Sequence, residues 1–151
     1  PYYNIAGNQN ISFWMPVDPV PLEWTLELVA GFHKWPWYIP RNFLENQAKW
    51  FPEGSLSEIP NIDSNPVKYT VMKWVLEPGD ALPFHMLKLH SGEGTGSLRR
   101  IFSIRILGGD ITHAPRSWKT SPEFPDLLDH LPAGRPMDHK LFPLTWPFSQ
   151  N

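Results

Sequence analysis

The chain reads, from residue 69 to residue 105, YTVMKWVLE-PGD-ALPFHMLKLH-SGEGTGSL-RRIFSIR, and this stretch decides the fold. Three runs rich in aromatic and β-branched residues alternate with turn residues, which predicts strands over 69–77, 81–90 and 99–107. The glycine-rich loop 91–98 is longer than the usual hairpin connection of about two to five residues. We therefore expect the chain to cross here between two facing sheets, which pack about 10 Å apart.

Strand alternation assigns the polar residues of this stretch to faces. Successive side chains of a strand point to opposite sides, so His85 and His90 point apart in a regular strand and cannot bind one metal ion. Arg99 and Arg105 share one face of the last strand. The opposite face is apolar after its first residue and is expected to pack into a core; it consists of Arg100, Phe102, Ile104 and Ile106. One histidine and one arginine are then expected to face each other across a narrow pocket.

Composition limits the possible functions. The chain has 151 residues, which suits a single domain over 1–151, and a formal net charge of −2, which indicates neither nucleic acid nor an anionic membrane as partner. It has no cysteine, which excludes disulfides, thiolate metal sites and cysteine nucleophiles. No apolar run approaches the roughly 20 residues of a membrane span, and no signal peptide opens the chain, so we expect a cytoplasmic location.

The high proline content favours short strands over long helices, because 18 prolines interrupt the 151 residues. Further strands are expected at 11–17, 23–30 and 111–114. The irregular, aromatic segment 32–66 is expected to be a lid-like insertion, since long excursions in compact domains are often functional. Short helical turns are possible at 40–50 and 124–130.

Three motifs of the chain have counterparts in one known family. They are Pro78-Gly79-Asp80, the pair Phe84-His85 followed by His90, and the run Arg99-Arg100-x-x-Ser103-x-Arg105. Together they resemble the distal half of the phytanoyl-CoA dioxygenase-like proteins, which are iron(II)/2-oxoglutarate oxygenases. Weaker resemblances lie at 8–19, 29–34, 108–110 and 142–143. The resemblance implies an all-β fold, a double-stranded β-helix (a cupin-like jelly roll).

The resemblance also implies site residues. His90 matches the third iron ligand of a 2-His-1-carboxylate triad, which leaves open positions for the cosubstrate and oxygen. Arg99 matches the arginine that holds the distal carboxylate of 2-oxoglutarate, and Trp14 matches a tryptophan of the cosubstrate pocket. Ser91 and Arg105 are weaker candidates for supporting contacts. The family's serine stands two residues after the histidine, where this chain has Gly92.

Each of these residues also has a plain structural interpretation. A lone histidine on a strand is usually structural, an arginine at a strand end is often only solvated, and Trp14 suits a core. His85 is interpreted as a packing or supporting residue. The histidines 33, 113, 130 and 139 are expected at the surface or in caps. Asp18, Asp80 and Asp110 stand beside proline or glycine and are interpreted as turn formers.

The family places a His-x-Asp pair, which supplies two of its three iron ligands, immediately upstream of the segment that resembles residues 1–3. That pair is absent from the 151 residues, so we expect the chain to be N-terminally incomplete. The implied function is hydroxylation of a small, partly hydrophobic organic substrate, with Fe(II) as cofactor and 2-oxoglutarate as cosubstrate. The alternative is a non-catalytic jelly-roll module that binds a ligand and has lost its metal site.

Overall fold

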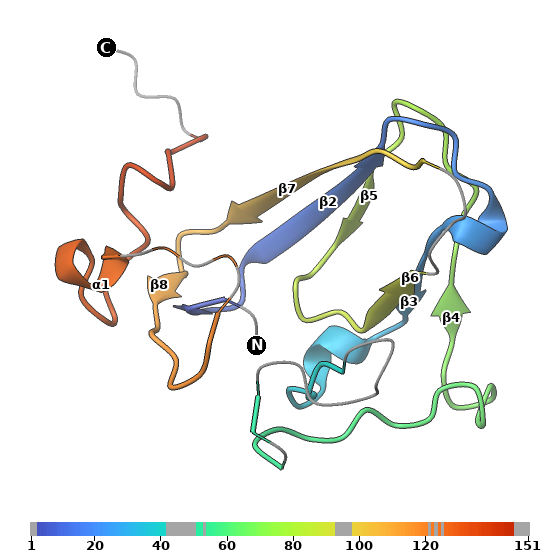
Figure 1. Cartoon of the computed structure of the whole chain (residues 1–151), viewed down its shortest axis with the longest axis horizontal. Helices are drawn as coiled ribbons and strands as arrows, with labels where there is room; N and C mark the ends of the chain where they lie inside the picture. Colours follow the sequence, from blue (N-terminus) through green and yellow to red (C-terminus); the bar gives the residue numbers. More distant parts are fainter. Residues whose placement is uncertain are drawn as a thin grey trace. The chain divides into compact units, whose positions relative to one another are not determined.

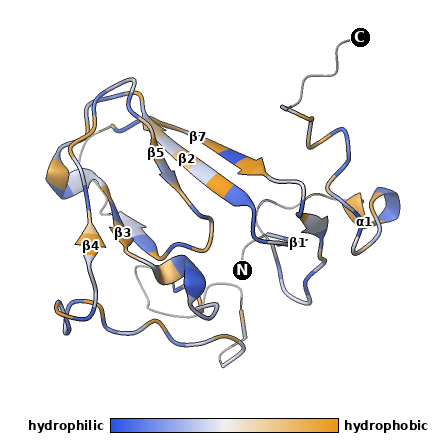
Figure 2. Ribbon diagram, turned by 180° about the vertical axis from the view of Figure 1, so that it is seen from behind, coloured by the Kyte–Doolittle hydropathy of each residue, from blue (hydrophilic) through white to orange (hydrophobic). Residues whose placement is uncertain are grey.

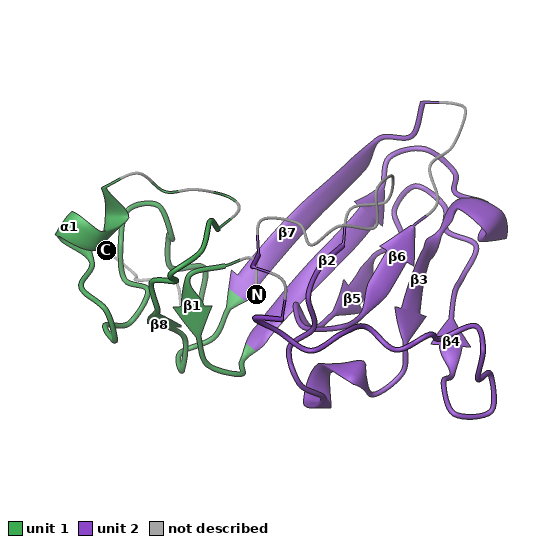
Figure 3. Ribbon diagram, turned by 60° about the horizontal axis from the view of Figure 1, so that its bottom comes forward, with its two compact units in different colours: residues 1–9, 107–151 green, residues 10–106 purple. Residues whose placement is uncertain are grey.

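The computed structural model describes residues 3–41, 51–52, 54–92, 98–120, 122, 124 and 126–146. It contains two compact units, residues 1–9 with 107–151 and residues 10–106 (Figure 3). The single domain expected over 1–151 stays a prediction, and each unit is described by itself. The helical turn expected at 40–50 lies almost wholly outside the described residues.

Two antiparallel sheets form the larger unit (Figure 1). One has the order β5-β2-β7 and the other the order β4-β3-β6. Their strands are β2 (Asn10–Pro16), β3 (Leu26–Val29), β4 (Val71–Met72), β5 (Leu82–Phe84), β6 (His90–Gly92) and β7 (Ile101–Leu107). Two 3₁₀ turns, η1 (Leu22–Trp24) and η2 (Phe32–Lys34), flank β3. The expected strands over 11–17 and 23–30 are thus present, the second shortened by η1.

The core of this unit draws residues from both sheets. Val20, Leu28, Leu76 and Leu82 are its buried members, all at most 7% exposed. The partly buried residues that pack against them are Trp14, Trp24, Leu26, Met72, Phe84 and Ile101. Each fully buried aliphatic side chain stabilises the fold by about 1.5–3 kcal/mol, so this cluster is what holds the two sheets of the unit together.

The run 81–90 is not one strand, which corrects the prediction. β5 ends at Phe84, and a turn follows in which the Lys88 amide donates to the His85 carbonyl at 2.8 Å. β5 pairs with β2, whereas β6 pairs with β3 in the other sheet. The segment 85–89 therefore carries the chain between the two sheets, and alternation cannot be counted across it. Of the run 69–77, only Val71–Met72 is a strand.

The apolar face of β7 is also not packed as expected. Phe102 is 57% exposed, and Ile104 and Ile106 are each 40% exposed. Ile101, on the opposite face of β7, packs against the core cluster, so alternation turns Phe102, Ile104 and Ile106 away from that core. The core prediction for this face is therefore wrong, although the strand itself is present and ends before Gly108 as expected.

Part of the aromatic segment 32–66 is anchored by its described residues. Phe32, Ile39 and Phe51 are 2%, 0% and 5% exposed. Phe32 stacks on Trp35 with ring centroids 4.7 Å apart and packs with Val29 and Tyr69 in a second buried cluster. The segment is an ordered excursion where the structure describes it, and its function as a lid stays a prediction.

The smaller unit pairs β1 (Ile5–Ala6) with β8 (Thr112–His113) and adds the short helix α1 (Leu127–His130). Two of its features bear on the sequence analysis. His113 is 2% exposed and bridges Asn4 and the Leu131 carbonyl through its two ring nitrogens, so the expected surface or capping role was wrong. Asp110 accepts the amides of Asn8 and Gln9, as expected for a residue that fixes a turn.

Within the described part of the chain, none of the helices has the length and apolar character needed to cross a membrane.

Candidate functional site

His90 opens β6, opposite Leu28 of β3, and its ring orientation is fixed by the backbone. The ring Nδ1 lies 2.7 Å from the Lys88 carbonyl oxygen. A carbonyl oxygen only accepts, so Nδ1 carries the proton and Nε2 keeps its lone pair. The side chain is exposed, and the same arrangement orients histidines that bind metals through Nε2. His90 therefore fits the chemistry of one metal ligand.

Phe84 lies against the His90 ring, with centroids 5.2 Å apart. The two residues come from different sheets, because Phe84 ends β5 and His90 begins β6. On one continuous strand over 81–90, these two residues would share a face but lie about 20 Å apart. The structure brings them together because the turn 85–89 folds the chain from one sheet onto the other.

Arg99 precedes β7 and points toward two tryptophans. Its guanidinium lies 5.7 Å from the centroid of the Trp14 ring and donates to the Trp24 carbonyl. Both Arg99 and Trp14 are partly buried. A guanidinium over an indole face is a favourable cation–π arrangement. The structure thus brings together the two residues that the resemblance assigns to the cosubstrate.

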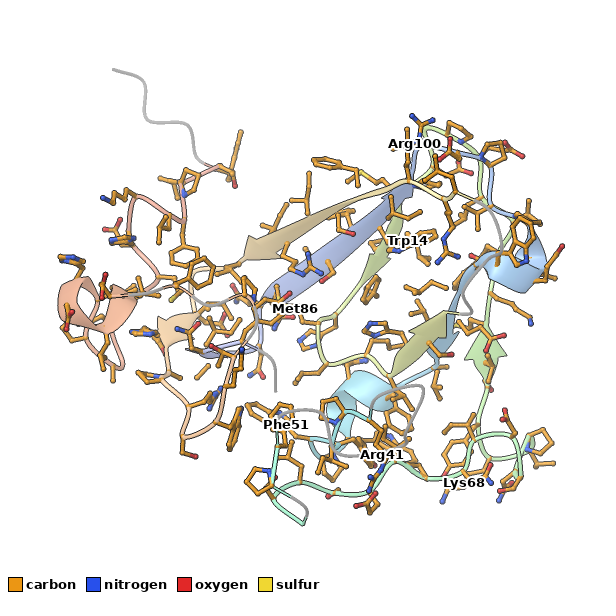
Figure 4. All side chains as sticks on the ribbon, viewed as in Figure 1. Trp14, Arg41, Phe51, Lys68, Met86 and Arg100 are labelled. Atoms are coloured by element: carbon orange, nitrogen blue, oxygen red, sulfur yellow. The ribbon has the colours of Figure 1, made fainter. Side chains whose placement is uncertain are left out.

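The register of β2 shows that His90 and Arg99 meet the same face of one sheet. Ser12 pairs with Phe84 and Trp14 pairs with Leu82, so these four side chains share a face. His90 packs on Phe84, at the Ser12 position, and Arg99 packs on Trp14, two residues further along β2. Two residues of a strand span about 7 Å, so the backbones of Ser12 and Trp14 lie about that far apart on this face. Figure 4 shows Trp14 in the space between the two sheets of this unit.

Arg100 is engaged elsewhere. It lies at the outer end of its sheet (Figure 4), where its Nη2 and Nε donate to the Asp18 carboxylate at 2.6 and 3.0 Å. Its backbone amide donates to the same carboxylate at 2.8 Å. These hydrogen bonds lower the pKa of Asp18 to about 2. The adjacent arginines therefore differ in role, since Arg100 holds the loop before η1 and Arg99 faces the interior.

Of the two weaker candidates, Ser91 is directed away from this face, whereas Arg105 has the parity of Ile101, which packs against the core cluster. Ser91 follows His90 along β6 and is paired with Glu27, so strand alternation directs its side chain to the other side. Arg105 is exposed on β7. The His85 ring lies 5.5 Å from that of His33.

A complete metal site is not assembled by the residues described. Within the described ranges, no group of three or more histidine, cysteine, aspartate or glutamate residues is arranged to hold a metal ion. Among these residues, His90 has the chemistry of a single metal ligand.

Two contributors to the site were missed in the sequence. The Trp24 carbonyl positions Arg99, and the Lys88 carbonyl orients His90. Neither has a sequence signal, because any residue supplies a backbone carbonyl.

The sequence matches no protein-family model, and no curated protein matches it. Its structure is similar to that of SnoK, a non-heme alpha-ketoglutarate-dependent carbocyclase from nogalamycin biosynthesis, with a TM-score of 0.57 and 19% identity. It is also similar to SnoN, a non-heme alpha-ketoglutarate-dependent epimerase from the same biosynthesis, with a TM-score of 0.58 and 18% identity. The similarity covers 93% and 95% of this chain but 50% and 52% of those two chains.

At this level of identity the comparisons establish the fold. The chain spans about half the length of the two structures, and the described residues are almost entirely strands, turns and loops in antiparallel sheets. The predicted fold class is confirmed: the chain is all-β and has the jelly-roll fold of 2-oxoglutarate-dependent enzymes.

Proposed function

We propose that this chain is part of an iron(II)/2-oxoglutarate-dependent oxygenase that acts on a small organic molecule. The observation that carries the proposal is that His90 packs on Phe84 and Arg99 packs on Trp14, two side chains of the same face of the β5-β2-β7 sheet. The fold shared with SnoK and SnoN supports it, since both of those proteins depend on alpha-ketoglutarate.

His90 is assigned as one iron ligand through Nε2. The hydrogen bond from Nδ1 to the Lys88 carbonyl holds the ring and selects the tautomer. The contact with Phe84 blocks one side of the ring with an apolar group, which keeps water from that side. The His-x-Asp pair that the family resemblance expects upstream is proposed to supply the other two protein ligands.

Arg99 is assigned to the distal carboxylate of 2-oxoglutarate. A guanidinium offers paired donors to a carboxylate, and the hydrogen bond to the Trp24 carbonyl leaves other N–H groups for a ligand. Trp14 supplies the apolar wall beneath the guanidinium. When bound, the iron supplies oxidation of 2-oxoglutarate by oxygen and hydroxylation of the substrate, while these residues orient the cosubstrate and exclude water.

Binding of 2-oxoglutarate to the full-length protein tests this proposal. With Mn(II) in place of iron and without oxygen, we expect 2-oxoglutarate to bind only in the presence of metal and to change the fluorescence of Trp14. His90→Ala is expected to abolish this metal-dependent binding of 2-oxoglutarate. A ligand-binding module without a metal site makes the opposite prediction, in which binding of any ligand is indifferent to Mn(II) and to His90→Ala.

The partly apolar character of the substrate is also part of the proposal. The described residues of 32–66 present Trp35, Tyr38 and Phe32 around Tyr69. If this segment covers the site, it offers aromatic surface to the substrate. The identity of the substrate is set by such surfaces and not by the fold.

A further inference from the structure

A cluster of basic side chains lies beside the turn that leads to His90. It consists of His33 and Lys34 from η2 and of His85 and Lys88 from the turn between β5 and β6. The rings of His33 and His85 lie 5.5 Å apart at an interplanar angle of 40°. Both views of this unit show η2 next to the β5–β6 turn, and hydrophilic colour on η2 (Figures 1 and 2). We call these four residues the basic cluster.

The backbone holds the basic cluster in place. The Lys88 amide donates to the His85 carbonyl at 2.8 Å, and the Leu87 amide lies 3.1 Å from His85 Nδ1. The Met86 amide donates to the Asn10 side chain at 2.9 Å, which ties the turn to β2. His85 accepts through Nδ1, so its proton is on Nε2. These bonds fix the backbone positions from which the His85 and Lys88 side chains extend.

The charges around His33 are of one sign. Its pKa is lowered below the usual value first by burial and then by Lys88, His85 and Lys34, in that order. The ammonium groups of Lys34 and Lys88 thus make the potential at this ring more positive, which favours an anion beside it. His33, His85 and Lys88 are each partly buried, which strengthens their interaction with an anion compared with a fully solvated patch.

We propose that the basic cluster binds an oxyanion, a phosphate or carboxylate group, of the substrate. The basic cluster lies close to His90 along the chain, because the turn that carries His85 and Lys88 continues directly into His90. The substrate class is therefore an organic acid or phosphate ester whose anionic group lies on the basic cluster while its reacting carbon lies at the His90 side. Assigning the anion to a substrate rests on the proposed function; the anion site itself does not.

Inorganic phosphate and acetate are the probes, titrated at fixed pH into the full-length protein while the ring signals of its histidines are followed by NMR. We expect phosphate, acetate or both to shift the His33 and His85 signals, and the tighter probe identifies the kind of oxyanion. Lys88→Ala is expected to weaken binding about tenfold or more, as for loss of a charged hydrogen-bonding partner. Lys88→Arg is expected to retain it.

Lys140→Ala is the matched control, because Lys140 is an exposed lysine of the other unit, and it is expected to bind as the wild type does. His33→Ala provides a second test that does not alter the turn before His90. If neither probe shifts the two rings in the wild type, or if Lys88→Ala and His33→Ala both bind normally, the anion site is refuted.

The two proposals fail separately. If 2-oxoglutarate shifts the NMR signals of the His33 and His85 rings and not that of the Trp14 indole, the basic cluster is a cosubstrate site. The assignment of its anion to the substrate is then overturned. If phosphate binds at the basic cluster but 2-oxoglutarate does not bind with metal, the anion site stands and the oxygenase proposal is refuted.

Discussion

Replacing Arg99 and Arg100 by leucine, one at a time, distinguishes an arginine that binds the cosubstrate from one that only supports the fold. Arg99 lies over the Trp14 ring and Arg100 binds the Asp18 carboxylate. Hydrogen bonds to a charged partner contribute about 1.5–3 kcal/mol, and each 1.4 kcal/mol corresponds to about tenfold in affinity. Arg99→Leu is therefore expected to weaken metal-dependent 2-oxoglutarate binding by about 10- to 150-fold. Arg100→Leu is expected to leave that affinity within about twofold.

Isothermal titration of 2-oxoglutarate into the full-length protein with Mn(II) measures both affinities. Arg99→Leu also leaves the Trp24 carbonyl without this donor, which costs about 1 kcal/mol of stability, so urea unfolding of each variant serves as the control for folding. Arg99→Lys is expected to recover only part of the affinity, because an ammonium group lacks the planar pair of donors. Equal losses for Arg99→Leu and Arg100→Leu, or a loss only for Arg100→Leu, would refute the assignment of Arg99.

Two further predictions concern the scaffold. Leu28→Ala is expected to lower the free energy of unfolding by about 2–5 kcal/mol, because Leu28 is 2% exposed in the core between the sheets. Val67→Ala, at a 97% exposed position, is expected to change that free energy by less than about 0.5 kcal/mol. Urea unfolding of both variants checks this, and equal effects would mean that Leu28 is not in a core. Arg100 lowers the folded pKa of Asp18 from 3.8 to about 2. The stabilisation is therefore complete above pH 3.8 and is lost as the pH falls toward 2. An NMR titration of the Asp18 carboxyl is expected to give a pKa near 2 in the wild type and near 3.8 in Arg100→Leu, and an unchanged pKa in that variant would contradict the ion pair.

The strands were predictable where alternation and turn residues agree. β7 and β8 lie within the ranges expected from the pattern, and β2 begins one residue before its expected range. The run 81–90 misled because its apolar residues continue through a turn, and a continuous apolar run does not show where a chain leaves one sheet for another. Only the pairing partners, β2 for one half and β3 for the other, decide that point.

Exposure on β7 was not predictable from the sequence. Phe102, Ile104 and Ile106 have the alternation of a core-facing strand, yet they are exposed in the structure. Alternation identifies which side chains share a face, and the number of other segments that pack on that face is a property of tertiary structure. His113 shows the opposite error, because it was expected at the surface and is buried. Nothing in the local sequence marks a histidine that is buried by segments distant in the chain.

The candidate site was predictable only through the family resemblance. Spacing alone leaves His90 as an ordinary strand histidine, although strand alternation places Arg99 and Arg100 on opposite faces of the strand. The structure supplies the difference between the arginines through Asp18 and Trp14. The roles of His90, Arg99 and Trp14 in binding iron and 2-oxoglutarate remain proposals.

A crystal structure of the full-length protein with Mn(II) and 2-oxoglutarate tests the central claim most directly. The account predicts that His90 binds the metal through Nε2, with Nδ1 still donating to the Lys88 carbonyl, and that the far carboxylate of the same 2-oxoglutarate lies on the Arg99 guanidinium above Trp14. A metal bound without His90, or a cosubstrate carboxylate held by a residue other than Arg99, would contradict it.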